Sequence, residues 1–146
     1  MFLCGFKKLK MTKKVIDQLT YEIIGAGIEV HKELGPGLVE SVYHKCLMHE
    51  LTLRGIRFVS EQYIEVEYKG MNVGADLRCD LFIEDLIVVE LKSVKAIEPI
   101  HEAVLLTYMK LLEAPKGILI NFNVTNIFKE GQKTYVNEFF YNYPLE

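Results

Sequence analysis

Residues 78–94, RCDLFIEDLIVVELKSV, decide the fold of this chain, because two strand-like runs follow one another here with a very short link between them. The runs cover about 76–83 and 86–94 and are rich in the apolar and β-branched residues that fill the interior of a sheet. The second run is apolar on both faces over 86–89, which indicates a central strand. The tight link at 84–85 therefore predicts two adjacent antiparallel strands in the middle of a sheet.

Three charged side chains, Asp80, Glu90 and Lys92, interrupt this apolar stretch. Glu90 and Lys92 are two residues apart on a strand and therefore point to the same face. If the link has an odd number of residues centred on Asp85, Asp80 lies opposite Glu90 on that face. An even link turns Asp80 to the other face unless a bulge restores the register. The first register brings two carboxylates to about 5 Å from each other.

Two carboxylates at such a distance repel each other, and the ammonium group of Lys92 offsets only one of them. A divalent cation resolves this imbalance, and Mg²⁺ binds through one or two carboxylates and several waters. Such an ion activates water and stabilises charge on a phosphate, while Lys92 can hold or deprotonate the attacking water. The alternative interpretation is that the Glu-x-Lys is a solvated strand end and that Asp80 begins a turn.

The remaining sequence predicts helices and further strands around this central pair. Helical periodicity indicates three helices, at about 19–34, 38–54 and 98–112. In the first helix the central apolar stripe is Ile24, Ile28 and His31, flanked by Ile23, Gly27 and Val30. In the second helix it is Val42, Cys46 and Leu53, flanked by Tyr43, Leu47 and Leu51. The stripes predict that the first two helices pack against each other.

An extended segment covers about 56–68, and a buried strand at 117–122 follows the third helix, which implies a parallel pair with a right-handed crossover. The resulting order, α-α-β-β-β-α-β, predicts an α/β fold with a mixed β-sheet flanked by helices. Residues 134–141 fit an edge strand or a short helix. We expect an N-terminal extension over residues 1–18 and a single domain over residues 19–146.

Composition narrows the classes of function. The chain has 146 residues, half of them hydrophobic, and a formal charge of −3, so it does not hold nucleic acid by bulk positive charge. A homodimer could still contact nucleic acid by bringing scattered Lys and Arg side chains together. The odd number of cysteines, Cys4, Cys46 and Cys79, indicates neither a disulfide framework nor a zinc site and favours the reducing cytoplasm. No apolar run is long enough for a membrane span.

The pattern of Asp80 followed by Glu90-Leu91-Lys92 resembles that of the PD-(D/E)xK superfamily, the restriction-endonuclease-like nucleases. Residues 37–43, GLVESVY, also match the GxxExxY signature of a small family within that superfamily. The surrounding segments GIEVHKELGPGLVESVY, HEAVLLTY and GILINFN are similar as well. The resemblance extends from about residue 19 to residue 123.

This resemblance implies a restriction-endonuclease-like core and a nuclease that uses Mg²⁺ or Mn²⁺. It implies that Glu40, Asp80, Glu90 and Lys92 form the catalytic set. The same three carboxylates, together with the carbonyl group of Leu91, are implied to bind the ion. The alternative for Glu40 is that it lies in the first turn of its helix and only interacts favourably with the helix dipole.

Tyr43 and His101 are assigned to substrate binding. Tyr43 shares a helix face with Glu40, and His101 near the start of the third helix is placed to approach a substrate phosphate. Each can instead be a packed residue with its polar group satisfied, as can Tyr108. One departure from the family is Val104, where related sequences often carry glutamine. In the wider superfamily a polar residue in that helix assists the site.

Two functional hypotheses follow. The first is a metal-dependent nuclease that hydrolyses phosphodiester bonds in nucleic acid, with DNA as the expected substrate. The second is a catalytically weak or inactive nuclease-fold module that binds nucleic acid or a protein partner. The aliphatic residue at position 104 and the acidic charge favour the second hypothesis, whereas the intact Asp80, Glu90 and Lys92 favour the first.

Overall fold

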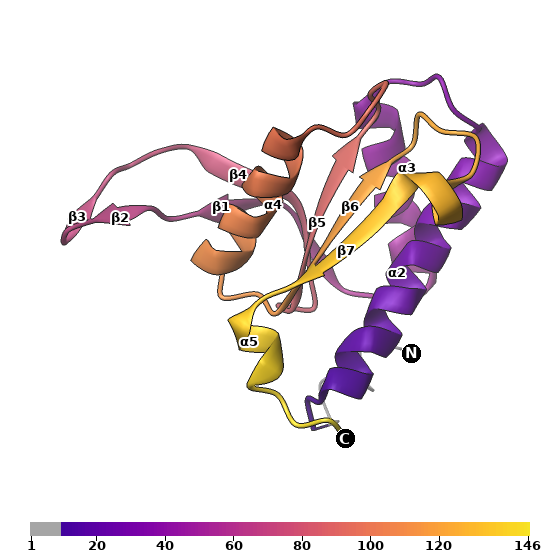
Figure 1. Ribbon diagram of the computed structural model, residues 1–146. Coiled ribbons are helices and arrows are strands. Elements are labelled where there is room, and N and C mark those ends of the chain that lie inside the picture. Colours follow the sequence, from indigo (N-terminus) through magenta and orange to yellow (C-terminus); the bar gives the residue numbers. More distant parts are fainter. Residues whose placement is uncertain (1–9) are drawn as a thin grey trace.

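A five-stranded mixed sheet forms the centre of the computed structural model, which describes residues 10–146 (Figure 1). Its strands run in the order β1-β4-β5-β6-β7, and β5 and β6 form its parallel pair while the other neighbours are antiparallel. The bounds are Phe58–Ile64 (β1), Leu77–Ile83 (β4), Ile87–Lys92 (β5), Lys116–Asn121 (β6) and Gln132–Val136 (β7). The predicted α/β class and mixed sheet are confirmed.

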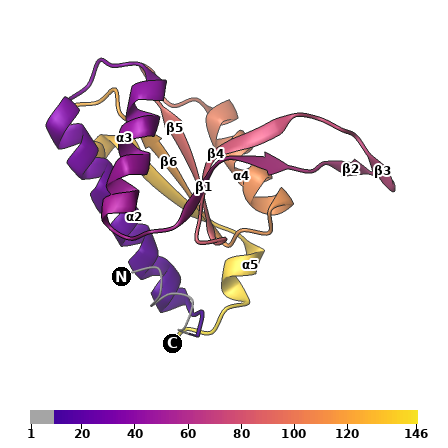
Figure 2. The same ribbon diagram turned by 180° about the vertical axis from the view of Figure 1, so that it is seen from behind.

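Helices cover both faces of this sheet (Figures 1 and 2). The long helices α2 (Lys13–Leu34) and α3 (Glu40–Leu53) pack on one face, and α4 (Pro99–Leu111) packs on the other. Each face has its own apolar cluster, because strand residues alternate between the two sides. The crossover from β5 through α4 to the parallel strand β6 agrees with the predicted strand–helix–strand unit.

A two-stranded arm extends beyond the main sheet. Strands β2 (Glu67–Tyr68) and β3 (Met71–Asn72) form its tip, which projects away from the body of the molecule (Figure 1). The turn between them contains Lys69 and Gly70, both with positive φ, as a type I′ hairpin turn requires. The arm joins β1 to β4, so these neighbouring strands are connected by the whole arm and not by a tight turn.

Helix α2 begins at Lys13, earlier than the predicted start at Leu19. The hydroxyl group of Thr12 accepts a hydrogen bond of 3.1 Å from the backbone N–H of Val15 and thereby caps the helix. The N–H of Lys13 also donates to the carbonyl of Pro144 at 2.8 Å, which ties the start of the helix to the C-terminal segment. The division of the chain at residues 18 and 19 stays a prediction, and residues 1–9, with Cys4, lie outside the described part.

The buried stripes of α2 and α3 differ from the predicted central stripes by about one residue. In α2 the buried residues are Ile16, Leu19, Thr20, Ile23, Ala26, Gly27 and Val30, while Ile28 is exposed. In α3 they are Tyr43, Leu47 and Leu51, whereas Leu53 is exposed. The predicted flanking residues therefore form the core, because both helices pack on the sheet as well as on each other.

The C-terminal segment contains both of the elements that the sequence left open. Strand β7 pairs with β6 at the edge of the sheet, after the π-helical segment η1 (Ile127–Gly131). The short helix α5 (Glu138–Tyr141) follows β7. Over residues 10–146, no helix combines the length and the hydropathy that crossing a bilayer demands.

Candidate metal centre

Asp80 lies where strand β4 loses its regular pairing with both neighbours. The antiparallel pairing with β5 runs from Ile83 and Ile87 to Leu81 and Val89 and ends there. That register places Asp80 opposite Glu90, as the odd link predicts. On the other side, the pairing of β4 with β1 is interrupted at Asp80. The carboxylate of Asp80 therefore lies at an opening in the middle of the sheet, where the regular pairing of the strands is interrupted.

The residue of β1 at this interruption is Glu61. Its φ of 56° lies in the left-handed region, which is uncommon for a residue other than glycine. The alternation of β4 also breaks here, because Cys79 packs in the same cluster as Phe82, on the face that α4 covers, while Leu81 packs under α2 and α3. Backbone irregularity of this kind is concentrated at functional sites.

Two reciprocal hydrogen bonds join Asp80 to β5. The N–H of Asp80 donates to Oε1 of Glu90 at 3.2 Å, and the N–H of Leu91 donates to Oδ2 of Asp80 at 2.8 Å. Each carboxylate thus accepts a bond from the backbone of the strand opposite. These bonds replace the regular ladder and fix both acidic groups beside the backbone of Leu91.

Glu90 is buried, although it carries an ionisable group. Burial, followed by the negative charge of Asp80, raises the pKa of Glu90 to about 8, although the Asp80 N–H and Lys92 act in the opposite direction. A group of this kind holds a proton at neutral pH unless a cation compensates its charge. The same surroundings, with burial as the main cause, raise the pKa of the Cys79 thiol to about 12, so Cys79 does not serve as a nucleophile.

Glu40 is placed by the turn that precedes α3. Leu38 in this turn is held from two sides, since its N–H donates to the hydroxyl oxygen of Tyr43 at 3.2 Å and its carbonyl accepts from the Ser93 hydroxyl at 2.6 Å. Ser93 immediately follows β5, so this bond fixes the start of α3 next to the strand that carries Glu90. Glu40 is the first residue of that helix.

The charges of Asp80 and Lys92 act on Glu40 as well as on Glu90. Although Glu40 is exposed at the helix start, partial burial of its carboxyl group and then the charge of Asp80 raise its pKa. Lys92 and His44 act in the opposite direction. Lys92 also opposes the rise in the pKa of Glu90, so its positive charge acts on both Glu40 and Glu90. Oxygen donors from α3, β4 and β5 are the ligand type that Mg²⁺ and Mn²⁺ accept.

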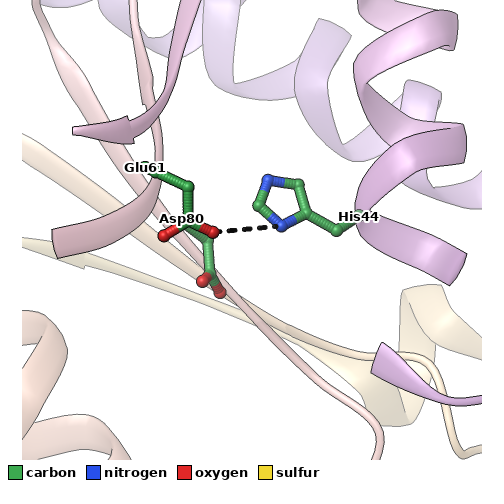
Figure 3. Close-up of side chains that lie close together, drawn as sticks. All are labelled: His44, Glu61 and Asp80. Carbon is green, nitrogen blue, oxygen red and sulfur yellow. Dashed lines mark ion pairs between the residues drawn. The ribbon is translucent and has the colours of Figure 1, made fainter. Parts of the chain in front are cut away.

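His44 and Glu61 join Asp80 in a cluster that the sequence analysis did not identify (Figure 3). One ligand atom from each of the three residues lies within 4.8 Å of the other two. His44 is one helical turn after Glu40, and this four-residue spacing is a signal that the sequence contained. Glu61 carried no comparable signal, because it approaches Asp80 only through the pairing of β1 with β4.

Tyr43 and His101 make contacts within the protein itself. The ring of Tyr43 is fully buried and stacks on Phe122, and its hydroxyl donates to the carbonyl of Gly35 at 2.6 Å. His101 is part of a capping box with Glu98 at the start of α4, where its Nδ1 accepts from the Glu98 N–H at 3.0 Å. These contacts give both residues a structural role, and their part in substrate binding stays a prediction.

On α4, Tyr108 is affected by the charges of the acidic pair. Burial is the main cause that raises the pKa of Tyr108, and the charges of Glu90, Cys79 and Asp80 add to it. Val104 precedes Tyr108 by one helical turn and is half-buried. Val104 and Tyr108 therefore share one face of α4, which carries an aliphatic group followed by a phenol.

Comparison with known proteins gives one match. The family model of the PD-(D/E)XK nuclease superfamily matches residues 17–134. No curated protein and no solved structure matches the chain. The matched region covers most of the chain and includes Glu40, Asp80, Glu90 and Lys92. Since the fold, the register of the central strands and the family model agree, the chain belongs to the PD-(D/E)XK nuclease superfamily.

Proposed function

We propose that this protein is a metal-dependent nuclease that hydrolyses phosphodiester bonds in DNA, with Mg²⁺ or Mn²⁺ as the cofactor. The observation that carries the proposal is the reciprocal bonding of Asp80 and Glu90 at the opening between β4 and β5. Two acidic groups held this close, one of them buried, are unfavourable without a compensating cation. Structural stability alone gives no reason to place them there.

The donor set fits a hard divalent cation. Asp80, Glu90 and the carbonyl group of Leu91 would hold it, and Glu40 would reach it from the start of α3. When bound, the ion supplies charge stabilisation for the phosphate and lowers the pKa of water. The membership in a nuclease superfamily supports this reading of the acidic residues.

Lys92 has a separate role in this proposal. It follows Glu90 by two residues on β5, so its ammonium group is on the same face as that carboxylate. Its charge is felt by both Glu40 and Glu90. We infer that Lys92 orients the attacking water and neutralises the negative charge that develops on the phosphate.

Further parts of the proposal rest on the sequence. Gly37, Glu40 and Tyr43 match the GxxExxY signature, and we infer from them that the chain belongs to this family within the superfamily. The formal charge of −3 favours a small contact surface on the substrate or a homodimer that gathers basic side chains. Cys46 and Cys79 are both free thiols, which fits the reducing cytoplasm as the site of action.

The second candidate function is an inactive nuclease-fold module that binds nucleic acid or a protein partner. Val104 favours it, because an aliphatic side chain one helical turn before Tyr108 supplies no hydrogen bond to a substrate or water. The metal-binding residues are present under both candidates, so only turnover distinguishes them.

Cleavage assays test the proposal directly. Supercoiled plasmid, single-stranded DNA and RNA are incubated with the protein in Mg²⁺ or Mn²⁺, and EDTA should stop the reaction. Lys92→Ala should lower the rate by about 100-fold or more, whereas Lys95→Ala, an exposed lysine three residues later, should leave it unchanged. Absence of cleavage by the wild type, or an undiminished rate for Lys92→Ala, contradicts the proposal.

A further inference from the structure

The cluster of His44, Glu61 and Asp80 differs from the Asp80–Glu90 pair in offering a nitrogen ligand. His44 projects from α3 toward the two acidic side chains, which come from β1 and β4 (Figure 3). Its Nδ1 lies 3.9 Å from Oε1 of Glu61, and all three ligand atoms lie within 4.8 Å of one another. The cluster shares Asp80 with the proposed nuclease centre and is otherwise built from different residues.

These separations are close to those of ligands around one ion. Ligand atoms that each lie about 2.1 Å from a transition-metal ion are roughly 3–4 Å apart. The observed separations therefore require only a small closure of the cluster. Glu61 can supply this movement, because its side chain is 58% exposed, whereas the side chain of His44 is 14% exposed and is held in place.

The second ring nitrogen of His44 is already occupied. Nε2 lies 3.1 Å from the hydroxyl oxygen of Ser60, a residue outside the cluster, and this contact leaves Nδ1 facing the carboxylates. A histidine that binds a metal ion through one ring nitrogen generally has a polar partner at the other, and this partner fixes the orientation of the ring. The contact with Ser60 thus gives His44 the arrangement of a metal ligand.

We propose that His44, Glu61 and Asp80 form a second cation site. This site binds a divalent transition-metal ion that takes nitrogen ligands, such as Co²⁺ or Zn²⁺, in preference to Mg²⁺. Imidazole is a good ligand for these ions, whereas Mg²⁺ takes oxygen ligands and gives up its waters reluctantly. The site rests on the proposed function only in sharing Asp80. The competing explanation is that His44 and Glu61 form a simple ion pair at the edge of α3.

Cobalt titration tests this site without relying on activity. Co²⁺ is added to the full-length protein while the visible absorption bands of the ion and the heat of binding are recorded, and Mg²⁺ is titrated in parallel. His44→Gln should weaken Co²⁺ binding by at least tenfold and change the absorption spectrum, while the affinity for Mg²⁺ changes by less than twofold. His49→Gln is the matched control, since His49 is an exposed histidine on the same helix.

Two further variants separate this site from the nuclease centre. Glu61→Gln changes an exposed side chain and should also weaken Co²⁺ binding, which guards against a folding defect in His44→Gln. Glu90→Gln should weaken Mg²⁺ binding and largely spare Co²⁺ binding. If neither His44→Gln nor Glu61→Gln alters Co²⁺ affinity, the second site is refuted, even where Glu90→Gln shows that the nuclease centre exists. If His44→Gln and Glu61→Gln both lose Co²⁺ binding while Glu90→Gln leaves Mg²⁺ binding unchanged, the second site is supported and the nuclease centre is contradicted.

Discussion

The backbone N–H of Asp80 donates a hydrogen bond of 3.2 Å to Oε1 of Glu90, so the two acidic residues are linked across the opening between two central strands. The bond from Leu91 to Asp80 completes the link in the opposite direction. Both carboxylates are thus held before any ligand arrives. Such a prearranged pair lowers the cost of organising a binding site, but it places a buried acid next to a second negative charge.

The first prediction concerns the stability cost of Glu90. The pKa of this group is about 8 in the folded protein and about 4.3 in an unfolded chain. Between these values the folded state keeps a proton that the unfolded state has lost, so stability falls as the pH rises. Glu90→Gln, which mimics the protonated acid, should therefore stabilise the metal-free protein at pH 8, by on the order of a few kcal/mol, and have little effect at pH 5.

Thermal unfolding in EDTA at both pH values measures this effect. Glu67→Gln serves as the control, because Glu67 is an exposed acid on the arm. If Glu90→Gln changes Tm by the same amount at pH 5 and pH 8, the raised pKa of Glu90 is contradicted.

The second prediction is that cation binding at the Asp80–Glu90 pair releases a proton. The ion requires Glu90 in its ionised form, whereas the metal-free protein holds Glu90 protonated below about pH 8. Affinity for Mn²⁺ should rise by up to about tenfold per pH unit between pH 6 and pH 8. Calorimetry of Mn²⁺ binding in two buffers of different ionisation enthalpy measures the number of protons released. Equal heats in both buffers at pH 7 would contradict proton release from Glu90.

The third prediction concerns the turn that places Glu40. Tyr43→Phe removes the hydroxyl that bonds to Gly35 and Leu38, and should lower the free energy of unfolding by roughly 1–3 kcal/mol. Tyr21→Phe is the matched control, since Tyr21 is 72% exposed. Urea denaturation of the two variants gives the comparison. Equal stability of both would show that the hydroxyl of Tyr43 does not hold this turn.

The fourth prediction follows from the departure at position 104. Val104 and Tyr108 are one turn apart on the same face of α4, and Tyr108 feels the charge of Glu90. If the protein is a nuclease, Val104→Gln should raise its cleavage rate several-fold without changing its affinity for Mn²⁺. The control is Leu106→Gln, an exposed position on the same helix. An unchanged or reduced rate for Val104→Gln would show that this residue does not limit the activity.

The central part of the fold was predictable from local sequence. The link fixes the register of its two strands because it is short. It covers residues 84–86, one residue more than the predicted link at Glu84-Asp85, and Glu84 and Asp85 both adopt positive φ. Periodicity and the flanking Pro and Gly residues were enough to predict α4 and the parallel strand after it.

What the sequence did not reveal depends on contacts between distant residues. The buried stripes of α2 and α3 follow from packing on two partners at once, which periodicity does not resolve. The approach of Glu61 to Asp80 depends on the pairing of β1 with β4, strands that are separated by the whole arm. Asp80 itself was found, but the break in its strand was not, because the surrounding apolar pattern is continuous.

The most direct test is a crystal of the protein soaked in Mn²⁺, with anomalous diffraction used to locate the ion. The account predicts an anomalous peak between the carboxylates of Asp80 and Glu90, at ligand distances of about 2.1 Å, with Glu40 facing it and Lys92 close by. The same experiment on Asp80→Ala should show no peak at this place. A wild-type crystal in which the peak is absent, or lies away from both carboxylates, would contradict the claim that they form a metal centre.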